Sequence, residues 1–181
     1  MVIIMLPEID RVDFSRPLNK MDLLQILKKE ASNIHIKEIM DATSYLNEDA
    51  RFMPITKQKE YIKRFTKAFF IRIKDIKEDK WHYIGLVDTI QLKDFLNVLE
   101  MQKNKAQSHS ELCFHKIARI VATYTAFIRE EPIHPVGTRF PGGFVLRYEN
   151  GVYYCPVKEK QINTPSALCR FCVSVQDDSV S

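Results

Sequence analysis

The sequence has few of the features that mark several large protein classes. Only five of its 181 residues are glycine, one is tryptophan and four are cysteine. No apolar run approaches the roughly 18 residues that a membrane-spanning helix needs. The opening stretch of residues 1–6 is too short for a signal-peptide core, and no basic residues precede it. We therefore expect a cytoplasmic protein that contacts no membrane, and we interpret residues 1–6 as a buried strand or arm.

The rest of the composition is that of a folded protein. Apolar residues make up 45% of the chain and charged residues 28%, both ordinary values that exclude wholesale disorder. The length suits one domain with a small appended module. The net charge of +4 is unevenly placed, because nine Lys or Arg residues and only four acidic residues fall within residues 57–80.

The chain changes character near Glu131. Four of the five glycines and five of the eight prolines follow this residue. Glycine and proline clusters indicate turns and loops rather than long helices. We predict a helical body over residues 1–130 and a glycine- and proline-rich tail over residues 131–181, packed on the body as one domain.

Hydrophobic periodicity predicts about five helices in the body. Residues that favour helix caps precede four of them, namely Asn19, Thr56, Asp88 and Ser108. On the second helix, the predicted inward face consists of Ile36, Ile39, Met40, Thr43 and Leu46. Residues 81–87 are compatible with either a strand or a helix start. The predicted helices span residues 20–32, 36–47, 57–76, 89–101 and 109–129.

The tail carries the signature of a β-hairpin. Two β-rich runs, residues 144–148 and 152–155, flank the dipeptide Asn150-Gly151. Asn-Gly between such runs is the strongest short-range hairpin signal. The predicted fold class is therefore mainly α, with about five helices, a small C-terminal β-hairpin and a cysteine knuckle.

Three of the four cysteines lie in this tail, with the spacing C-x13-C-x2-C formed by Cys155, Cys169 and Cys172. In a reducing cytoplasm such a cluster indicates a metal site or redox chemistry rather than disulfides. A Cys-x-x-Cys pair can direct both thiolates to one point, which suits a tetrahedral zinc ion and a [4Fe–4S] cluster equally well. We predict that the three cysteines form one metal site holding zinc or a [4Fe–4S] cluster.

A fourth ligand is needed to complete the set. The first candidate is Cys113 on the apolar face of the last long helix, provided that this helix docks against the tail. The alternative for Cys113 is an ordinary buried core cysteine. His134, just before the hairpin, is the second candidate; His109 and His115 rank below it.

Other interpretations of these residues remain open. The Cys169-x-x-Cys172 pair could be a redox-active dithiol, but the strand–helix context of thioredoxin-like proteins is missing. The three tail cysteines could also be unrelated buried thiols. The basic segment 57–80 carries aromatic residues and could bind nucleic acid, although a solvated lysine-rich face is the commoner cause of such charge. Apart from the cysteines, no catalytic constellation is visible.

Four segments of the tail form a distinctive set: His134–Gly137, Phe140–Gly143, Tyr153–Gln161 and Ala167–Cys172. Together they resemble an archaeal family of unknown function that is found chiefly in methanogens. The resemblance covers residues 134–176 and implies an archaeal, anaerobic cytosol. It carries no activity or assigned ligand, but an anaerobic cell favours an iron–sulfur cluster over zinc.

Three functions follow as hypotheses. The first is a non-catalytic metal-binding accessory protein, in which the metal fastens the tail and shapes a surface for another protein. The second is an enzyme or electron-transfer protein that uses a [4Fe–4S] cluster. The third is a nucleic-acid-binding protein that works through the basic segment 57–80.

Overall fold

The computed structural model describes residues 7–180. The predicted strand or arm over residues 1–6 lies outside the described residues. Within them, none of the helices combines the length and the apolar character required to cross a membrane.

Five long helices build the body, as the sequence predicts. A short 3-10 turn, η1 (Glu8–Arg11), precedes them. The last long helix, α5, continues into a π-helical turn, η2 (Tyr124–Ile128), so that the helical run ends next to Arg129 as expected. The long helices are α1 (Lys20–Ser32), α2 (Ile36–Ala50), α3 (Ile55–Glu78), α4 (Thr89–Lys103) and α5 (His109–Thr123).

Side-chain caps fix the starts of three of these helices. Asn19 accepts a hydrogen bond from the Asp22 amide, and Ser108 accepts one from the Glu111 amide. Asp88 caps α4 in the same manner. The predicted cap at Thr56 is wrong, because α3 begins at Ile55, two residues earlier than predicted, and Pro54 precedes it without a side-chain cap. Proline is tolerated at a helix start because the N–H groups there have no acceptor within the helix, so the N–H that proline lacks costs no hydrogen bond.

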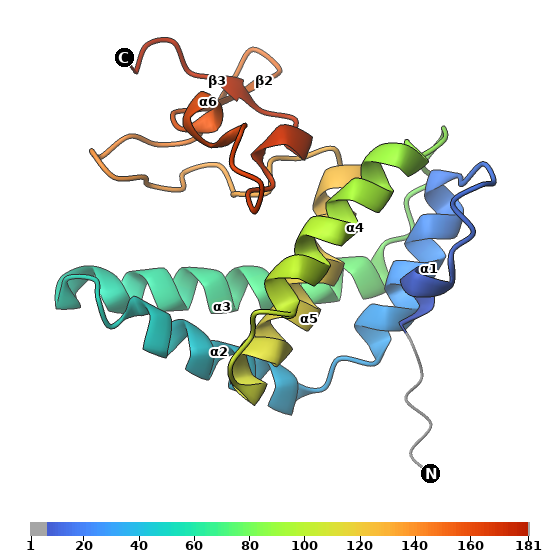
Figure 1. Cartoon of the computed structure of the whole chain (residues 1–181). Coiled ribbons are helices and arrows are strands. Elements are labelled where there is room, and N and C mark those ends of the chain that lie inside the picture. Colours follow the sequence, from blue (N-terminus) through green and yellow to red (C-terminus); the bar gives the residue numbers. More distant parts are fainter. Residues whose placement is uncertain (1–6, 181) are drawn as a thin grey trace.

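Helix α5 lies at the centre of the body and packs against α2, α3, α4 and α1 (Figure 1). Its buried residues include Cys113, Ile117 and Ile120. On α2 the packed face is rotated from the predicted one: Ile36 and Met40 are exposed, with relative accessibilities of 59% and 64%, whereas Ile39 and Leu46 are buried as predicted. The face of α2 that packs inward consists of Ile39, Ala42, Leu46 and Ala50.

A hydrogen-bonded carboxylate joins the end of α3 to η2. The hydroxyl of Tyr124 donates to Asp79 over 2.6 Å, and that of Tyr83 donates over 2.9 Å. Residues 81–87 form neither a regular strand nor a helix. Their main link to the body is an isolated bridge between Asn19 and Leu86.

The predicted hairpin is present in the tail. Strands β1 (Arg147–Glu149) and β2 (Val152–Cys155) pair antiparallel across Asn150 and Gly151, whose φ angles of 51° and 82° are those of a tight hairpin turn. A two-residue strand, β3 (Val175–Gln176), adds to β2 in parallel and was not predicted. A one-turn helix, α6 (Lys158–Gln161), and a 3-10 turn, η3 (Cys169–Phe171), lie between them.

The tail forms a lobe that lies over α3 and against α4 (Figure 1). A small apolar cluster makes the contact, in which Leu168 and Phe171 of the tail pack against Phe95 and Leu99 of α4. The rings of Phe95 and Phe171 meet edge to face, with centroids 5.3 Å apart. The chain is therefore mainly α-helical with a small C-terminal β structure, which confirms the predicted fold class.

Candidate metal centre

The three tail cysteines and His134 line one cavity of about 580 Å³. Cys155 comes from the end of β2, Cys169 and Cys172 from the knuckle around η3, and His134 from the loop that precedes the hairpin. All four cysteines of the chain are free thiols. The fold thus brings together thiols and an imidazole from three separate segments of the tail.

Cys155 is buried near two backbone N–H groups of the segment that follows it. Burial raises the pKa of its thiol, and the backbone N–H groups of Val157 and Lys158 partly oppose that rise. The Cys155 carbonyl accepts the amide of Asp177 over 3.0 Å, which holds the segment after the knuckle against β2. N–H donors directed at a sulfur stabilise the thiolate, the form that binds a metal.

The knuckle is held by contacts on both of its sides. The amide of Cys172 donates to the Cys169 carbonyl over 3.2 Å, which closes the turn. Lys158 donates to the Cys172 carbonyl over 2.6 Å. The Phe171 side chain between the two cysteines enters the apolar cluster on α4. The position of both thiols is therefore fixed by the docking of the tail on the body.

Electrostatic effects within the cavity link the thiols to one another. Burial raises the pKa of Cys169, and the neighbouring Cys155 and Cys172 raise it further. Three neighbouring thiolates repel one another in a site from which water is partly excluded, so a bound cation would relieve an unfavourable arrangement of charge.

His134 completes the polar side of the cavity. Its ring meets Phe140 edge to face, with centroids 5.4 Å apart. The side chain keeps surface open to the cavity, yet the protein packed around the ring lowers its pKa, because desolvation disfavours the charged imidazolium. Neutral imidazole is the form that acts as a metal ligand.

Among residues 7–180, the three tail cysteines do not form a set whose ligand atoms all lie within 4.8 Å of one another. A single tetrahedral ion binds its ligands at one point, whereas each cysteine of an iron–sulfur cluster binds a different iron. Both kinds of centre take ligands that line one cavity, as these thiols do.

Cys113 lies elsewhere. It is buried on α5, where its sulfur is 3.5 Å from Nε2 of His109, and the charged groups that influence it are on α2 and α5. It does not line the tail cavity, whereas His134 does. His115 lies 3.7 Å from Glu111 on the same helix. Of the two leading candidates for the fourth ligand, the structure brings only His134 to the three tail cysteines.

Sequence reasoning missed two residues near this site. Lys158 lines the cavity and Ser174 is buried in its wall, with its hydroxyl 3.1 Å from the Cys172 sulfur. Serine and lysine are common in loops and carry no pattern of their own. Their positions depend on the parallel pairing of β2 and β3. A two-residue strand leaves no sequence pattern from which this pairing could be predicted.

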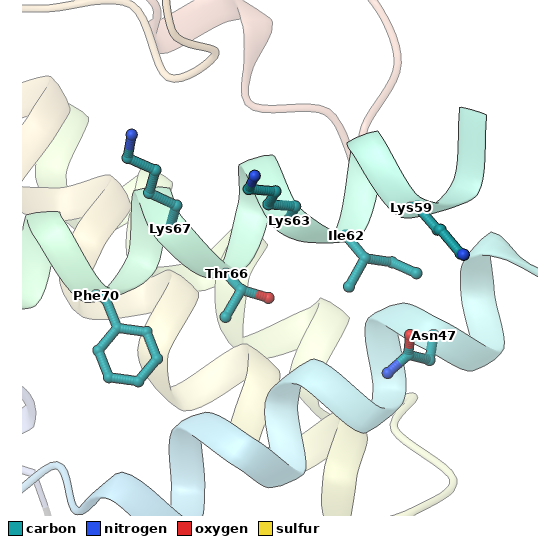
Figure 2. Close-up of a pocket in the computed structure, with 7 residues that line it drawn as sticks. All are labelled: Asn47, Lys59, Ile62, Lys63, Thr66, Lys67 and Phe70. Carbon is teal, nitrogen blue, oxygen red and sulfur yellow. The ribbon is translucent and has the colours of Figure 1, made fainter. Parts of the chain in front are cut away.

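The basic segment forms a second surface feature. A shallow groove beside α3 is lined by Lys59, Lys63 and Lys67 (Figure 2). Ile62, Thr66 and Phe70 also line it, with Asn47 of α2 opposite Ile62. Phe69, in contrast, is a buried core residue.

Comparison with known proteins identifies relatives along nearly the whole chain. A family profile described as "Uncharacterized protein conserved in archaea (DUF2115)" matches residues 19–177. A UPF0305 protein of Methanothermobacter thermautotrophicus is 60% identical over 164 residues, which cover 91% of this chain and 100% of the relative. A UPF0305 protein of Methanocaldococcus jannaschii is 32% identical over 161 residues, which cover 88% of this chain and 97% of the relative. No solved structure matches the chain.

Proposed function

The chain belongs to the DUF2115 family of archaeal proteins, and we propose that it is a non-catalytic metal-binding accessory protein. In this proposal Cys155, Cys169 and Cys172 bind one metal centre in the tail, and His134 is the fourth ligand. The metal fastens the tail and shapes a surface for another protein. The observation that carries the proposal is the convergence of these four side chains, from three segments of the tail, on one cavity.

The tail needs such a fastening because its regular structure is slight. Its three strands contain three, four and two residues, and its helix α6 is a single turn. Ladders this short cannot offset the entropy of ordering about fifty residues. A metal that joins β2, the knuckle and the His134 loop would add its binding free energy to the stability of the folded tail.

The identity of the metal sets the choice between a purely structural role and electron transfer. A [4Fe–4S] cluster would open the alternative role of an iron–sulfur electron-transfer protein or enzyme. A closed four-ligand zinc site, by comparison, would be structural only.

Metal analysis of anaerobically purified protein tests the proposal. A brown protein with a broad absorbance band near 400 nm would identify the cluster, and a colourless protein whose zinc is lost in the tail cysteine variants would identify a structural site. Cys155→Ser, Cys169→Ser and Cys172→Ser should each remove or strongly deplete this centre, and His134→Gln should weaken it. His82→Gln is the matched control for His134, because His82 is exposed and lies outside the cavity. Wild-type metal content in all three cysteine variants would contradict the proposal.

A second candidate function is binding of a polyanion such as nucleic acid along α3. The observation that favours it is the row of Lys59, Lys63 and Lys67 at helical spacing beside one groove. None of the three is in an ion pair with any other residue of the described chain. Phosphate contacts release counterions, so binding should weaken steeply with salt.

Fluorescence anisotropy with short DNA and RNA duplexes, measured between low and physiological salt, checks this candidate. The triple variant Lys59→Gln, Lys63→Gln, Lys67→Gln should lose binding and flatten the salt dependence. A control triple with the same change of charge consists of Lys74 and Lys77, near the end of α3, and Lys80, just after it. Equal loss in both triples, or salt-independent binding, would argue against a site at the groove.

A further inference from the structure

A second set of ligating side chains lies in the helical body, away from the tail cavity. It consists of Asp41 on α2 and of His109 and Cys113 on α5. The three ligand atoms all lie within 4.8 Å of one another, and no other set of three His, Cys, Asp or Glu side chains within residues 7–180 does so. The set uses none of the residues assigned to the tail centre.

The packing of two helices builds this set. His109 and Cys113 are four residues apart, so both side chains lie on one face of α5. The Ser108 cap fixes the start of α5 and thereby the position of His109 in its first turn. Helix α2 makes its most extensive packing with α5 and presents Asp41 to that face.

The distances are those of ligands around one tetrahedral ion. The Cys113 sulfur and the Asp41 carboxylate each lie 3.5 Å from Nε2 of His109. Zinc bonds of ordinary length at tetrahedral angles separate sulfur from nitrogen by about 3.6 Å and nitrogen from oxygen by about 3.3 Å. Both observed distances are close to these values, and the sulfur and the carboxylate lie within 4.8 Å of each other.

Hydrogen bonding alone accounts less well for this arrangement. Both contacts converge on the same ring nitrogen, Nε2. A ring nitrogen carries either one hydrogen or one lone pair, so it can serve only one of the two partners fully. A cation placed between the three atoms would satisfy all of them at once.

The charges also match a divalent ion. A thiolate, a carboxylate and a neutral imidazole carry two negative charges, which one divalent ion neutralises. The charge of the adjacent Glu38 is compensated by Lys116, whose Nζ lies 2.6 Å from the Glu38 carboxylate. Glu38 therefore does not alter the net charge at the three ligands. Nitrogen, sulfur and oxygen ligands together suit zinc rather than magnesium or calcium, which bind through oxygen.

We propose that Asp41, His109 and Cys113 bind one Zn²⁺ ion in the helical body, with a fourth coordination position open to solvent. The open position follows from the exposure of His109, whose side chain is 78% accessible, while Cys113 is buried beneath it. Three protein ligands with a free fourth position are the arrangement of zinc sites that bind water or a small ligand, rather than of closed structural sites.

Titration of the apo-protein with Co²⁺ tests this site without interference from the tail. In a chain that carries Cys169→Ser and Cys172→Ser, one Co²⁺ per chain should still bind and give a near-ultraviolet sulfur-to-cobalt band. His109→Gln in that chain should weaken binding by roughly tenfold or more and diminish the band. The matched control is again His82→Gln, the same change at an exposed histidine outside both sites, which should leave binding intact.

A second measurement covers the case in which the tail variant fails to fold. In the otherwise wild-type chain, His109→Gln should lower the zinc content by one equivalent relative to His82→Gln, with an unchanged circular dichroism spectrum because His109 is exposed. Equal zinc content in these two variants would overturn the proposal, as would the absence of a sulfur-to-cobalt band in a folded tail variant. Neither result would bear on the tail centre, whose test rests on Cys155, Cys169 and Cys172.

Discussion

At the scale of single residues, the four cysteines divide into two environments. Cys155, Cys169 and Cys172 surround the tail cavity, whereas Cys113 lies with Asp41 and His109 in the body. The spacing of the tail cysteines was sufficient to group them. The place of Cys113 was not predictable, because periodicity puts a residue on the apolar face of a helix but does not say which neighbour covers it.

Asp79 is a residue whose charge state matters for stability. Burial alone would raise its pKa, but hydrogen bonds from Tyr124, the Trp81 amide and Tyr83 outweigh burial and hold the pKa below its usual value. Burial raises the pKa of the Tyr124 phenol, and the hydrogen bond to Asp79 raises it further. The carboxylate is therefore the favoured form in the folded chain.

The sign of the pH effect follows from this lowered pKa. A carboxylate with a lower pKa in the folded than in the unfolded state adds stability above its unfolded pKa and loses it as the pH falls through its folded pKa. Asp79→Asn should therefore lower the free energy of unfolding at neutral pH and reduce its decline below about pH 4. Urea titrations across that range measure this effect, with the exposed Asp178→Asn as the control. An identical pH dependence in Asp79→Asn and wild type would contradict the assignment.

At the scale of elements, the sequence predicted a helix or a hairpin correctly where residues of that element fix its own start or turn. The predicted bounds of α1 are those observed, because the Asn19 cap acts on its own first turn. The Asn150-Gly151 turn placed the hairpin for the same reason. The rotated face of α2 was missed because Ile36 and Met40 are apolar yet exposed, and a single sequence does not distinguish such residues from core. Strand β3 was missed because two residues form no pattern.

The docking of the knuckle on α4 is the contact that links the tail site to the body. Phe171 lies between the two knuckle cysteines and packs on Phe95. Phe171→Ala should remove this anchor and destabilise the tail by about 2 kcal/mol, less than a fully buried phenylalanine because the ring is only partly buried. It should also reduce metal retention in the presence of a chelator.

Chelator competition and urea unfolding, followed together, measure both effects of Phe171→Ala. Val173→Ala is the control, since this neighbouring apolar side chain is 48% exposed. If Phe171→Ala and Val173→Ala retain metal equally, the knuckle is positioned without its contact to α4. That result would contradict the role assigned to Phe171.

At the scale of the whole molecule, a helical body with a continuous core carries a tail that has little core of its own. The main cluster contains residues of α1, α2, α3, α4 and α5, whereas the smaller cluster joins the tail to α4 and η2. The division near Glu131 could be expected from glycine and proline content. The lateral position of the tail over α3 could not, because it depends on side-chain contacts between distant parts of the chain.

The claim that a metal fastens the tail is tested most directly by hydrogen–deuterium exchange before and after metal removal. Chelation should abolish protection in residues 152–155 and 169–177, because the metal would join these segments. Amides of α1 provide the internal reference and should keep their protection. Unchanged exchange in both tail segments after verified loss of metal would contradict the claim.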